Sequence, residues 1–377
     1  MVQDGLVAVQ YVLLPLLAQS LGLSYAQIGI LRAIGMTAMS LLEIPGGILA
    51  DRISKRLLLA GGLMVAGGGY VGMAQTSGFH GVALCFFLAG AGAAFQHSIA
   101  SAMIIQVFSE SSRRRALGTY NASGDAGKLA YTGFFSLAIS AGLSWQLTTL
   151  MLGLSAVLFG LWIVFAITDS PPAPTVTQPE QSSESTDYWG IRHARRFWTL
   201  CSITFLDSLV QSVFLTFVAF VMLEKGSSAG VASLAVVLVL IGGMVGKFAC
   251  GFMASRYGDR MTFQLLQAST VVGLFLVYLL DPVVLLVMLP LVGLVVQATS
   301  TVTYGSVAAE VHHDKQSRGY ALMYSFSGLS SIAGPFAFGL LADQFGATTA
   351  MAWLSLAAII TLPLAAVLTP LHRDQPR

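Results

Sequence analysis

The feature that most limits the fold of this chain is a series of twelve apolar segments, each long enough to cross a bilayer. A helical span needs about 20 residues, and in hydrocarbon each backbone amide must be bonded within a helix or closed barrel. Of the 377 residues, 55% are hydrophobic and 10% charged, against about 25% charged in soluble domains. We therefore predict an all-α polytopic membrane protein. The predicted spans cover residues 2–20, 25–49, 57–76, 80–106, 116–140, 144–168, 197–222, 229–253, 261–280, 283–309, 317–342 and 347–369.

A constant offset between two parts of the sequence indicates that the chain is duplicated. Three pairs of residues in two short loops are each 204 residues apart: Gly47 with Gly251, Arg52 with Arg256, and Arg56 with Arg260. Self-similarity at one fixed spacing is typical of repeated structural units. We therefore predict two pseudo-symmetric six-helix bundles, an N-terminal one at 1–169 and a C-terminal one at 197–377, joined by a linker at 170–196.

The composition changes from apolar in the spans to polar in the linker. The linker is rich in Pro, Ser, Thr and Glu, and such a segment cannot bury a core, so we expect a flexible connection. The basic stretch from Ile191 to Trp198 is predicted to form a short interfacial helix before the seventh span. The first apolar segment has no basic region or cleavage site before it, so we interpret it as mature structure.

The basic residues predict the orientation of the chain. Fifteen Lys and Arg residues lie at the span ends and loops on one side of the predicted topology, and only Lys225 lies in a loop on the other. Loops rich in Lys and Arg stay in the cytoplasm. We therefore expect both termini and the linker on the cytoplasmic side.

The loop after the second span reads Gly47-Ile48-Leu49-Ala50-Asp51-Arg52-Ile53-Ser54-Lys55-Arg56 and resembles a signature of the major facilitator superfamily, with Ser54 in place of the usual Gly. The second copy keeps Gly251 and Arg260 but has Ser255 at the position of the acid. Twelve spans in two halves extend this resemblance over the whole chain. Three shorter stretches resemble the fosmidomycin-resistance branch of bacterial facilitators: Leu23–Gly29, Phe95–His97 and Ser123–Gly127.

Two departures from the family pattern leave the transport direction open. Antiporters of this superfamily usually carry a Gly-Pro pair in the fifth span, where this chain has Tyr131-Thr132. The Arg that precedes the glycine-rich run of the fourth span in many proton-coupled members is Phe86 here. The narrower resemblance favours export of toxic compounds, whereas these departures argue against proton antiport.

The resemblance implies alternating access of two halves around a central site and a gate at the cytoplasmic side. In this interpretation Asp51 lies near the start of the eleventh span, where a helix N-terminus favours negative charge. The alternative is a topology anchor without a gating role. Glu43 and Lys247, which are 204 residues apart, are further gate candidates, or each is paired locally. The gate candidates are Glu43, Gly47, Asp51, Arg52, Arg56, Lys247, Gly251, Arg256 and Arg260.

Ionisable residues inside spans are costly and usually face a water-filled cavity. Arg32 and Glu43 are eleven residues apart and share one face of the second span. Asn121, Asp125 and Lys128 begin a polar stripe on the fifth span, which either lines a cavity or is internally bonded. Asp125 and Lys128 are spaced to neutralise each other. Alternatively, Lys128 binds an anionic group of the substrate.

A second repeat places a carboxylate in the first span of each half. The stretches that begin at Asp4 and Asp207 match at an offset of 203 residues. Asp207 has Thr204, Ser208 and Gln211 nearby in sequence, so we expect it to have polar partners. Asp207, Asp125, His97 and Asp4 are candidates for proton coupling, with interface placement of Asp4 and packing of His97 as alternatives. The predicted cavity residues are Arg32, Asn121, Asp125, Lys128, Asp207 and Gln211.

These features predict a secondary transporter driven by an ion gradient, with H+ as the expected ion. Three intramembrane cations favour a small organic anion or zwitterion as the solute, because they can donate charge-assisted hydrogen bonds to it. A multidrug exporter of lipophilic cations is the first alternative, and a non-transporting sensor a remote one. No nucleotide-binding or hydrolase motif occurs, so we expect no enzyme activity, cofactor, metal or nucleic-acid partner. We expect a monomer in the cytoplasmic membrane of a bacterium.

Overall fold

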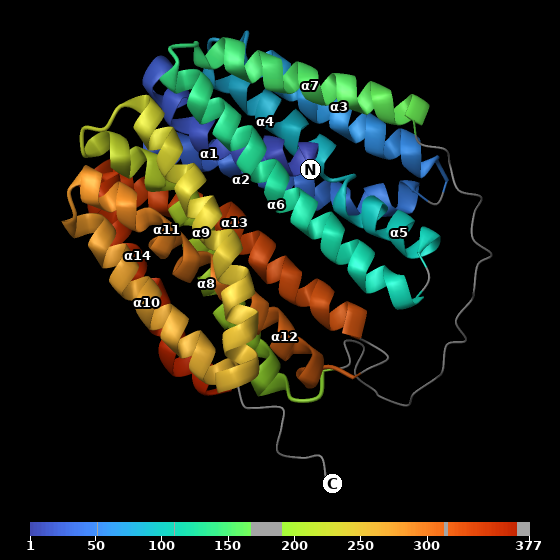
Figure 1. Cartoon of the computed structure of the whole chain (residues 1–377), viewed down its shortest axis with the longest axis vertical. Helices are drawn as coiled ribbons and strands as arrows, with labels where there is room; N and C mark the ends of the chain where they lie inside the picture. Colours follow the sequence, from blue (N-terminus) through green and yellow to red (C-terminus); the bar gives the residue numbers. More distant parts are fainter. Residues whose placement is uncertain (51, 109, 167–190, 313–315, 368–377) are drawn as a thin grey trace. The chain divides into compact units, whose positions relative to one another are not determined.

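The computed structural model describes residues 1–50, 52–108, 110–166, 191–312 and 316–367, and within them the chain is almost entirely helical (Figure 1). The first seven helices are α1 (Val2–Leu21), α2 (Tyr25–Leu49), α3 (Lys55–Met73), α4 (Phe79–Ala93), α5 (His97–Val107), α6 (Glu110–Ser140) and α7 (Trp145–Ala166). The others are α8 (Ala194–Glu224), α9 (Ala229–Tyr257), α10 (Asp259–Leu279), α11 (Pro282–Ala298), α12 (Ser300–Glu310), α13 (Gln316–Phe345), α14 (Ala347–Leu364) and the 3-10 turn η2 (Ala365–Val367).

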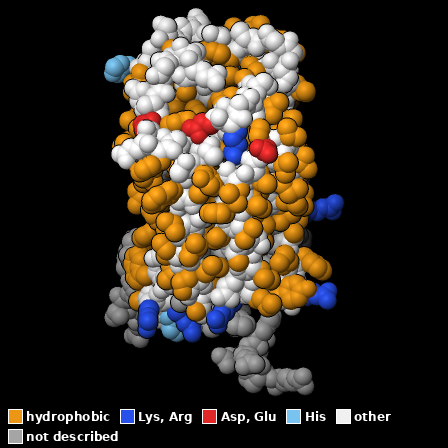
Figure 2. Space-filling view, turned by 90° about the vertical axis from the view of Figure 1, so that its left-hand side faces the viewer, with side chains coloured by type: hydrophobic (Ala, Val, Ile, Leu, Met, Phe, Trp, Pro, Cys, Tyr) orange, Lys and Arg blue, Asp and Glu red, His pale blue; other side chains and the backbone are white. Residues whose placement is uncertain are grey.

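The helices have the length and surface expected of membrane spans. Within the described ranges, ten helical segments are long and apolar enough to cross a bilayer, and α4 is a shorter apolar helix. Figure 2 shows hydrophobic side chains over the middle of the visible face and Lys and Arg side chains gathered at its lower end. Lipid contact explains why large hydrophobic residues such as Phe165 and Phe248 are exposed, since no water surrounds this belt.

The chain folds into two compact units, called here the first and the second unit. The first comprises Met1–Gln181 with Ala229–Leu234, and the second comprises Ser182–Ser228 with Ala235–Arg377. In the first unit α1 packs on α6, and α3 packs on α4 and α7; in the second, α8 packs on α13 and α14, and α10 packs on α14. Most of the predicted linker 170–196 lies outside the described residues.

Two predicted spans are interrupted, which corrects the expectation of continuous helices at 80–106 and 283–309. The first consists of α4 and α5, separated by a turn at residues 94–96, and the second of α11 and α12, separated at Thr299. The two breaks lie at equivalent positions, because Phe95 and Thr299 are 204 residues apart. Hydropathy missed the second break because the average over Pro282–Val307 stays high in spite of the polar residues beside Thr299.

The predicted interfacial helix from Ile191 to Trp198 is wrong. Helix α8 already begins at Ala194, and Ile191 forms an isolated antiparallel bridge with Val311. The amide of Arg192 donates a hydrogen bond of 2.9 Å to the carbonyl of Glu310. The backbone before α8 is therefore satisfied by the end of α12 instead of by a separate helix.

Glycine allows close backbone contact inside each unit. A Cβ on Gly90 of α4 would lie 2.0 Å from the carbonyl oxygen of Gly35 on α2. In the second unit, a Cβ on Gly242 of α9 would lie 1.9 Å from the carbonyl oxygen of Pro290 on α11. Small residues of this kind let membrane helices pack without a side chain between them.

The end of α8 caps the start of α14. Glu224 accepts hydrogen bonds from the amides of Ala347 and Thr348 at 2.7 and 2.8 Å, and from the Thr348 hydroxyl at 2.7 Å. A carboxylate at a helix N-terminus satisfies free amides and interacts favourably with the helix dipole. Glu224 therefore holds α14 on α8.

We predict that Glu224→Ala lowers the free energy of unfolding by about 1–2 kcal/mol, because α14 loses its cap. Thermal unfolding of the detergent-purified protein measures this change. Asp281→Ala is the matched control, since Asp281 precedes α11 but its side chain makes no capping hydrogen bond. Equal losses in both variants would contradict a specific capping role for Glu224.

Candidate functional site

Asp207 of α8 is a buried carboxylate, only 4% exposed. Gln211 Nε2 donates to its Oδ2 at 2.8 Å, and Gln267 Nε2 of α10 donates to its Oδ1 at 2.7 Å. The Thr299 hydroxyl lies 2.7 Å from Oδ1 and 2.8 Å from Oδ2. Its single hydrogen can therefore form a hydrogen bond with either oxygen. Every donor is neutral, and no Lys, Arg or His among the described residues forms an ion pair with Asp207.

Sequence reasoning identified Asp207 and Gln211 but chose the wrong further partners. Ser208 instead bonds Ser327 of α13, with 2.8 Å between the hydroxyl oxygens. The hydroxyl of Thr204 is buried and has no hydrogen-bond partner in the described structure. The actual partners, Gln267 and Thr299, come from other helices. No local pattern marks them, apart from the rarity of glutamine in an apolar span.

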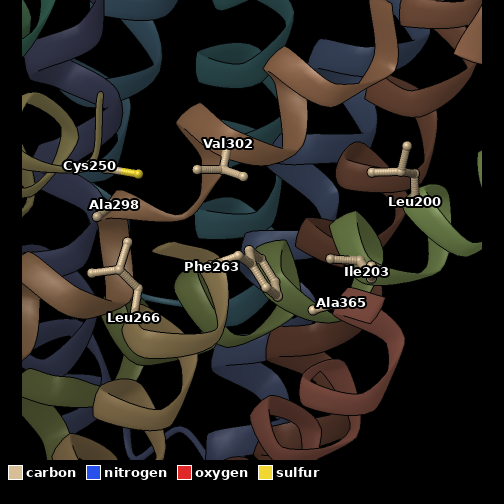
Figure 3. Packing of buried hydrophobic residues seen from close by; sticks show 8 residues of the cluster. All are labelled: Leu200, Ile203, Cys250, Phe263, Leu266, Ala298, Val302 and Ala365. Atoms are coloured by element: carbon tan, nitrogen blue, oxygen red, sulfur yellow. The ribbon is translucent and has the colours of Figure 1, made fainter. Parts of the chain in front are cut away.

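Thr299 links Asp207 to the break between α11 and α12. It is the N-cap residue of α12 and is fully buried. Beside the break, a hydrophobic cluster joins five helices and η2 (Figure 3). Its members are Leu200, Ile203, Cys250, Phe263, Leu266, Ala298, Val302 and Ala365. This packing holds the residues before and after Thr299, so its hydroxyl stays directed at the carboxylate.

Asp4 of α1 occupies the equivalent place in the first unit. Gln96, the N-cap residue of α5, donates from Nε2 to Asp4 Oδ2 at 2.9 Å. His97 Nε2 lies 3.7 Å from Asp4 Oδ1, and His97 Nδ1 lies 3.4 Å from the Tyr120 hydroxyl of α6. Asp4 is buried among these groups. Each unit thus bonds a carboxylate of its first helix to the break in its fourth span.

Arg32 of α2 is 2% exposed and is among the largest fully buried side chains of the described residues. Its Nη1 donates to Gln10 Oε1 of α1, and its Nη2 donates to the Tyr11 hydroxyl at 3.1 Å. The guanidinium carbon lies 4.6 Å from the centre of the Tyr11 ring, in a cation–π arrangement. Arg32 Nε is buried without a hydrogen-bond partner, and no described carboxylate pairs with this cation.

Lys128 of α6 is already paired. Its Nζ donates to Asp125 Oδ1 at 2.9 Å, which is the i, i+3 pair that the spacing indicated. Thr132, further along the predicted polar stripe, donates from its hydroxyl to the carbonyl of Lys128 at 2.6 Å. Asn121 lies on the same helix and is exposed. The stripe is therefore internally bonded over part of its length.

The gate candidates remain predictions. Asp51, which that interpretation needs most, lies outside the described residues. Arg52, Arg256 and Arg260 are exposed, whereas Arg56, Glu43 and Lys247 are partly buried. No atom lies within 4 Å of a Cβ built on Gly47 or Gly251, so local packing does not require glycine there. Within the described ranges, no cluster of three or more His, Cys, Asp or Glu is arranged to hold a metal.

The second unit also carries an aromatic group that sequence reasoning missed. The ring centres of Tyr304 and Tyr324 are 5.0 Å apart, those of Tyr320 and Tyr324 are 6.4 Å apart, and those of Trp198 and Phe326 are 5.9 Å apart. Trp198 is 45% exposed and Tyr324 is 53% exposed. Exposed aromatic faces of this kind can bind organic cations.

The comparisons with known proteins agree with this architecture. The Major Facilitator Superfamily profile matches residues 2–205 and 200–377, whereas no curated protein sequence matches the chain. A solved bacterial homologue of the human lysosomal transporter Spinster, inward-facing and occupied, has a TM-score of 0.81 at 15% identity, covering 100% of this chain and 96% of its own. A mutant form of the nucleoside transporter NupG has a TM-score of 0.79 at 13% identity, covering 98% and 99% respectively. These likenesses show a shared fold.

We predict that Thr299→Val destabilises the protein by about 1–3 kcal/mol, because the buried carboxylate of Asp207 loses a donor. The loss should shrink in an Asp207→Asn background, with a coupling energy of about 0.5–3 kcal/mol in a double-mutant cycle of thermal unfolding. Thr303→Val is the matched control, since the Thr303 hydroxyl bonds only the carbonyl of Ser300. Additive effects of Thr299→Val and Asp207→Asn would contradict the coupling.

Proposed function

This chain belongs to the major facilitator superfamily and is a secondary transporter, and we propose that it moves a small organic anion or zwitterion by alternating access coupled to protons. The family assignment covers both halves of the chain. The chain has the all-α fold of twelve membrane-crossing segments, in which α4 with α5 and α11 with α12 each count as one. Transport, and not an enzymatic reaction, is the activity that this family supports.

The environment of Asp207 is the observation that supports proton coupling. An ionised carboxylate inside a membrane protein is costly unless it is paired with a cation. Asp207 has only neutral donors from Gln211, Gln267 and Thr299. A bound proton removes the charge without any movement of another ion, so this carboxylate is suited to carry one proton per cycle.

The break at Thr299 offers a way to couple the protonation of Asp207 to a change in the helices. The ionised carboxylate accepts a hydrogen bond from the Thr299 hydroxyl at either oxygen. A protonated carboxyl group has one acceptor fewer and one donor more, so the hydrogen bonds at this cap rearrange. Interrupted helices are the places where transporters bind ions and change shape. We therefore propose that Asp207 and Thr299 couple proton binding to movement.

His97, Asp4 and Asp125 are secondary candidates for proton transfer. His97 contacts both Asp4 and Tyr120, and an imidazole ring can both donate and accept a hydrogen bond. Asp125 is neutralised by Lys128, which makes it less suited to take up a proton alone. We propose Asp207 as the main coupling group and the Asp4–His97 pair as an accessory one.

The location of the protein and the direction of transport are inferred from different observations. The excess of Lys and Arg on one side supports a cytoplasmic membrane protein with both termini in the cytoplasm. The resemblance to the fosmidomycin-resistance branch favours export of a toxic compound, but Tyr131-Thr132 replaces the Gly-Pro pair of antiporters. The proposal therefore includes coupling and solute class, and leaves the direction to measurement.

A second candidate function is the export of lipophilic cations. The exposed rings of Trp198 and Tyr324 favour it, because aromatic faces attract organic cations. The carboxylate of Asp207 would attract such a cation electrostatically. Against it stands Arg32, a buried cation that would repel such a solute. We therefore keep this function as the second candidate.

We predict that Asp207→Asn reduces solute-driven proton movement at least tenfold, because asparagine cannot exchange a proton. Protein in liposomes that contain the pH dye pyranine is exposed to carboxylates, phosphonates and amino acids, and separately to tetraphenylphosphonium. Asp281→Asn, outside the spans, is the control and should keep wild-type rates.

Two results would contradict the proposal. Proton movement at the wild-type rate in Asp207→Asn would remove Asp207 from the coupling step. A response to tetraphenylphosphonium alone, without any response to anions or zwitterions, would favour the second candidate function.

A further inference from the structure

Arg32 is a buried positive charge that no carboxylate among the described residues neutralises. Arginine stays charged under all ordinary conditions, and an unpaired charge inside a membrane span is energetically costly. The contacts of Arg32 are the side-chain oxygens of Gln10 and Tyr11 and the ring of Tyr11. All are neutral, so the site keeps a net charge of one unit.

A purely structural role does not require this charge. Arg32 joins α2 to α1 through two hydrogen bonds, and a neutral residue such as glutamine could donate to the same partners. Breaking a buried ion pair usually destabilises because one charge is left unpaired; here the charge is already unpaired. The arrangement therefore suggests that the counter-ion of Arg32 comes from outside the chain.

We infer that Arg32, Gln10 and Tyr11 bind the anionic group of the transported solute, a carboxylate, phosphate or phosphonate. This inference rests on the proposed transport function and specifies its solute class. A guanidinium matches such groups because two parallel N–H donors meet two oxygens. Arg32 Nε is buried and has no partner in the described structure, so at least one donor is available.

Of the two residues that contact the guanidinium, Tyr11 is the one that is only partly buried. It is partly buried, whereas Arg32 behind it is enclosed. The Tyr11 ring covers the guanidinium and its hydroxyl accepts from Nη2. When an anion arrives, Tyr11 can turn aside and direct its hydroxyl proton to an anion oxygen. The same residue then acts as cover in the empty state and as donor in the bound state.

The other intramembrane cation of the first unit is a weaker candidate. Lys128 is bonded to Asp125 at 2.9 Å, so that pair has no net charge to attract an anion. The sequence named both Arg32 and Lys128 as candidates for an anionic group and left open whether Lys128 is neutralised by Asp125. Because Lys128 is paired, we place the anion site at the contact between α1 and α2 and not on α6.

The test measures binding of four probes that share one ring and differ in charge: phenylphosphonate, benzoate, benzyl alcohol and benzylammonium. Thermal shifts of the detergent-purified full chain give the dissociation constants. We expect wild-type protein to bind the two anions at least tenfold more tightly than benzyl alcohol. Arg32→Gln should abolish this preference, and Arg32→Lys should weaken it, because lysine lacks the planar fork.

Two further measurements separate binding from a structural role. Without probe, Arg32→Gln should melt at or above the wild-type temperature, since an unpaired buried charge is removed. Tyr11→Phe keeps the ring and should raise the anion dissociation constants severalfold by removing the hydroxyl. The control is Lys225→Gln, which removes a cation that donates to the carbonyls of Tyr278 and Leu280 and should leave the anion preference unchanged.

Several outcomes would overturn the inference. These are equal shifts with benzoate and benzyl alcohol in wild-type protein, full anion binding in Arg32→Gln, or unfolding of Arg32→Gln together with wild-type anion binding in Tyr11→Phe. Binding in detergent needs no proton gradient. Asp207→Asn should therefore still bind anions, so a failure of proton coupling is distinguishable from a failure of the Arg32 site.

Discussion

The cost of a charge in a low-dielectric interior organises both units of this protein. Asp207 is the clearest case, because the carboxylate is enclosed by three neutral donors from α8, α10 and the break before α12. Without any one of these donors, a carboxylate oxygen would lose a hydrogen bond in an apolar environment. The positions of α10 and of the break are therefore tied to one side chain, and so is the proposed coupling of protonation to movement.

The two units share one arrangement around a carboxylate, with different side chains in each. In each unit a carboxylate of the first helix accepts a hydrogen bond from the N-cap residue at the break of the fourth span, Gln96 or Thr299. Asp4 has a titratable neighbour in His97, whereas Asp207 has none among its hydrogen-bond partners. The two units therefore share this arrangement, while the side chains around each acid differ.

The two units also differ in the charge that they leave uncompensated. The first encloses the cation of Arg32 among neutral groups, and the second encloses the acid of Asp207. The second also exposes aromatic rings at Trp198 and Tyr324. In the proposed function, the first unit binds the anionic part of a solute and the second unit carries the proton. This division is the reason why we propose an anion or zwitterion, and not a lipophilic cation, as the solute.

The sequence by itself determined the spans, the duplication and the ionisable residues inside the membrane, because hydropathy, spacing and charge are local properties that a reader can count. It also identified the Asp125–Lys128 pair, which is one helical turn. Only the tertiary structure decided which charges are neutralised. Gln267 and Thr299 are 60 and 92 residues from Asp207, and Arg32 is bonded across 22 residues to Gln10. Such contacts depend on how helices pack and rotate against one another, as do the two breaks, and no local pattern specifies that.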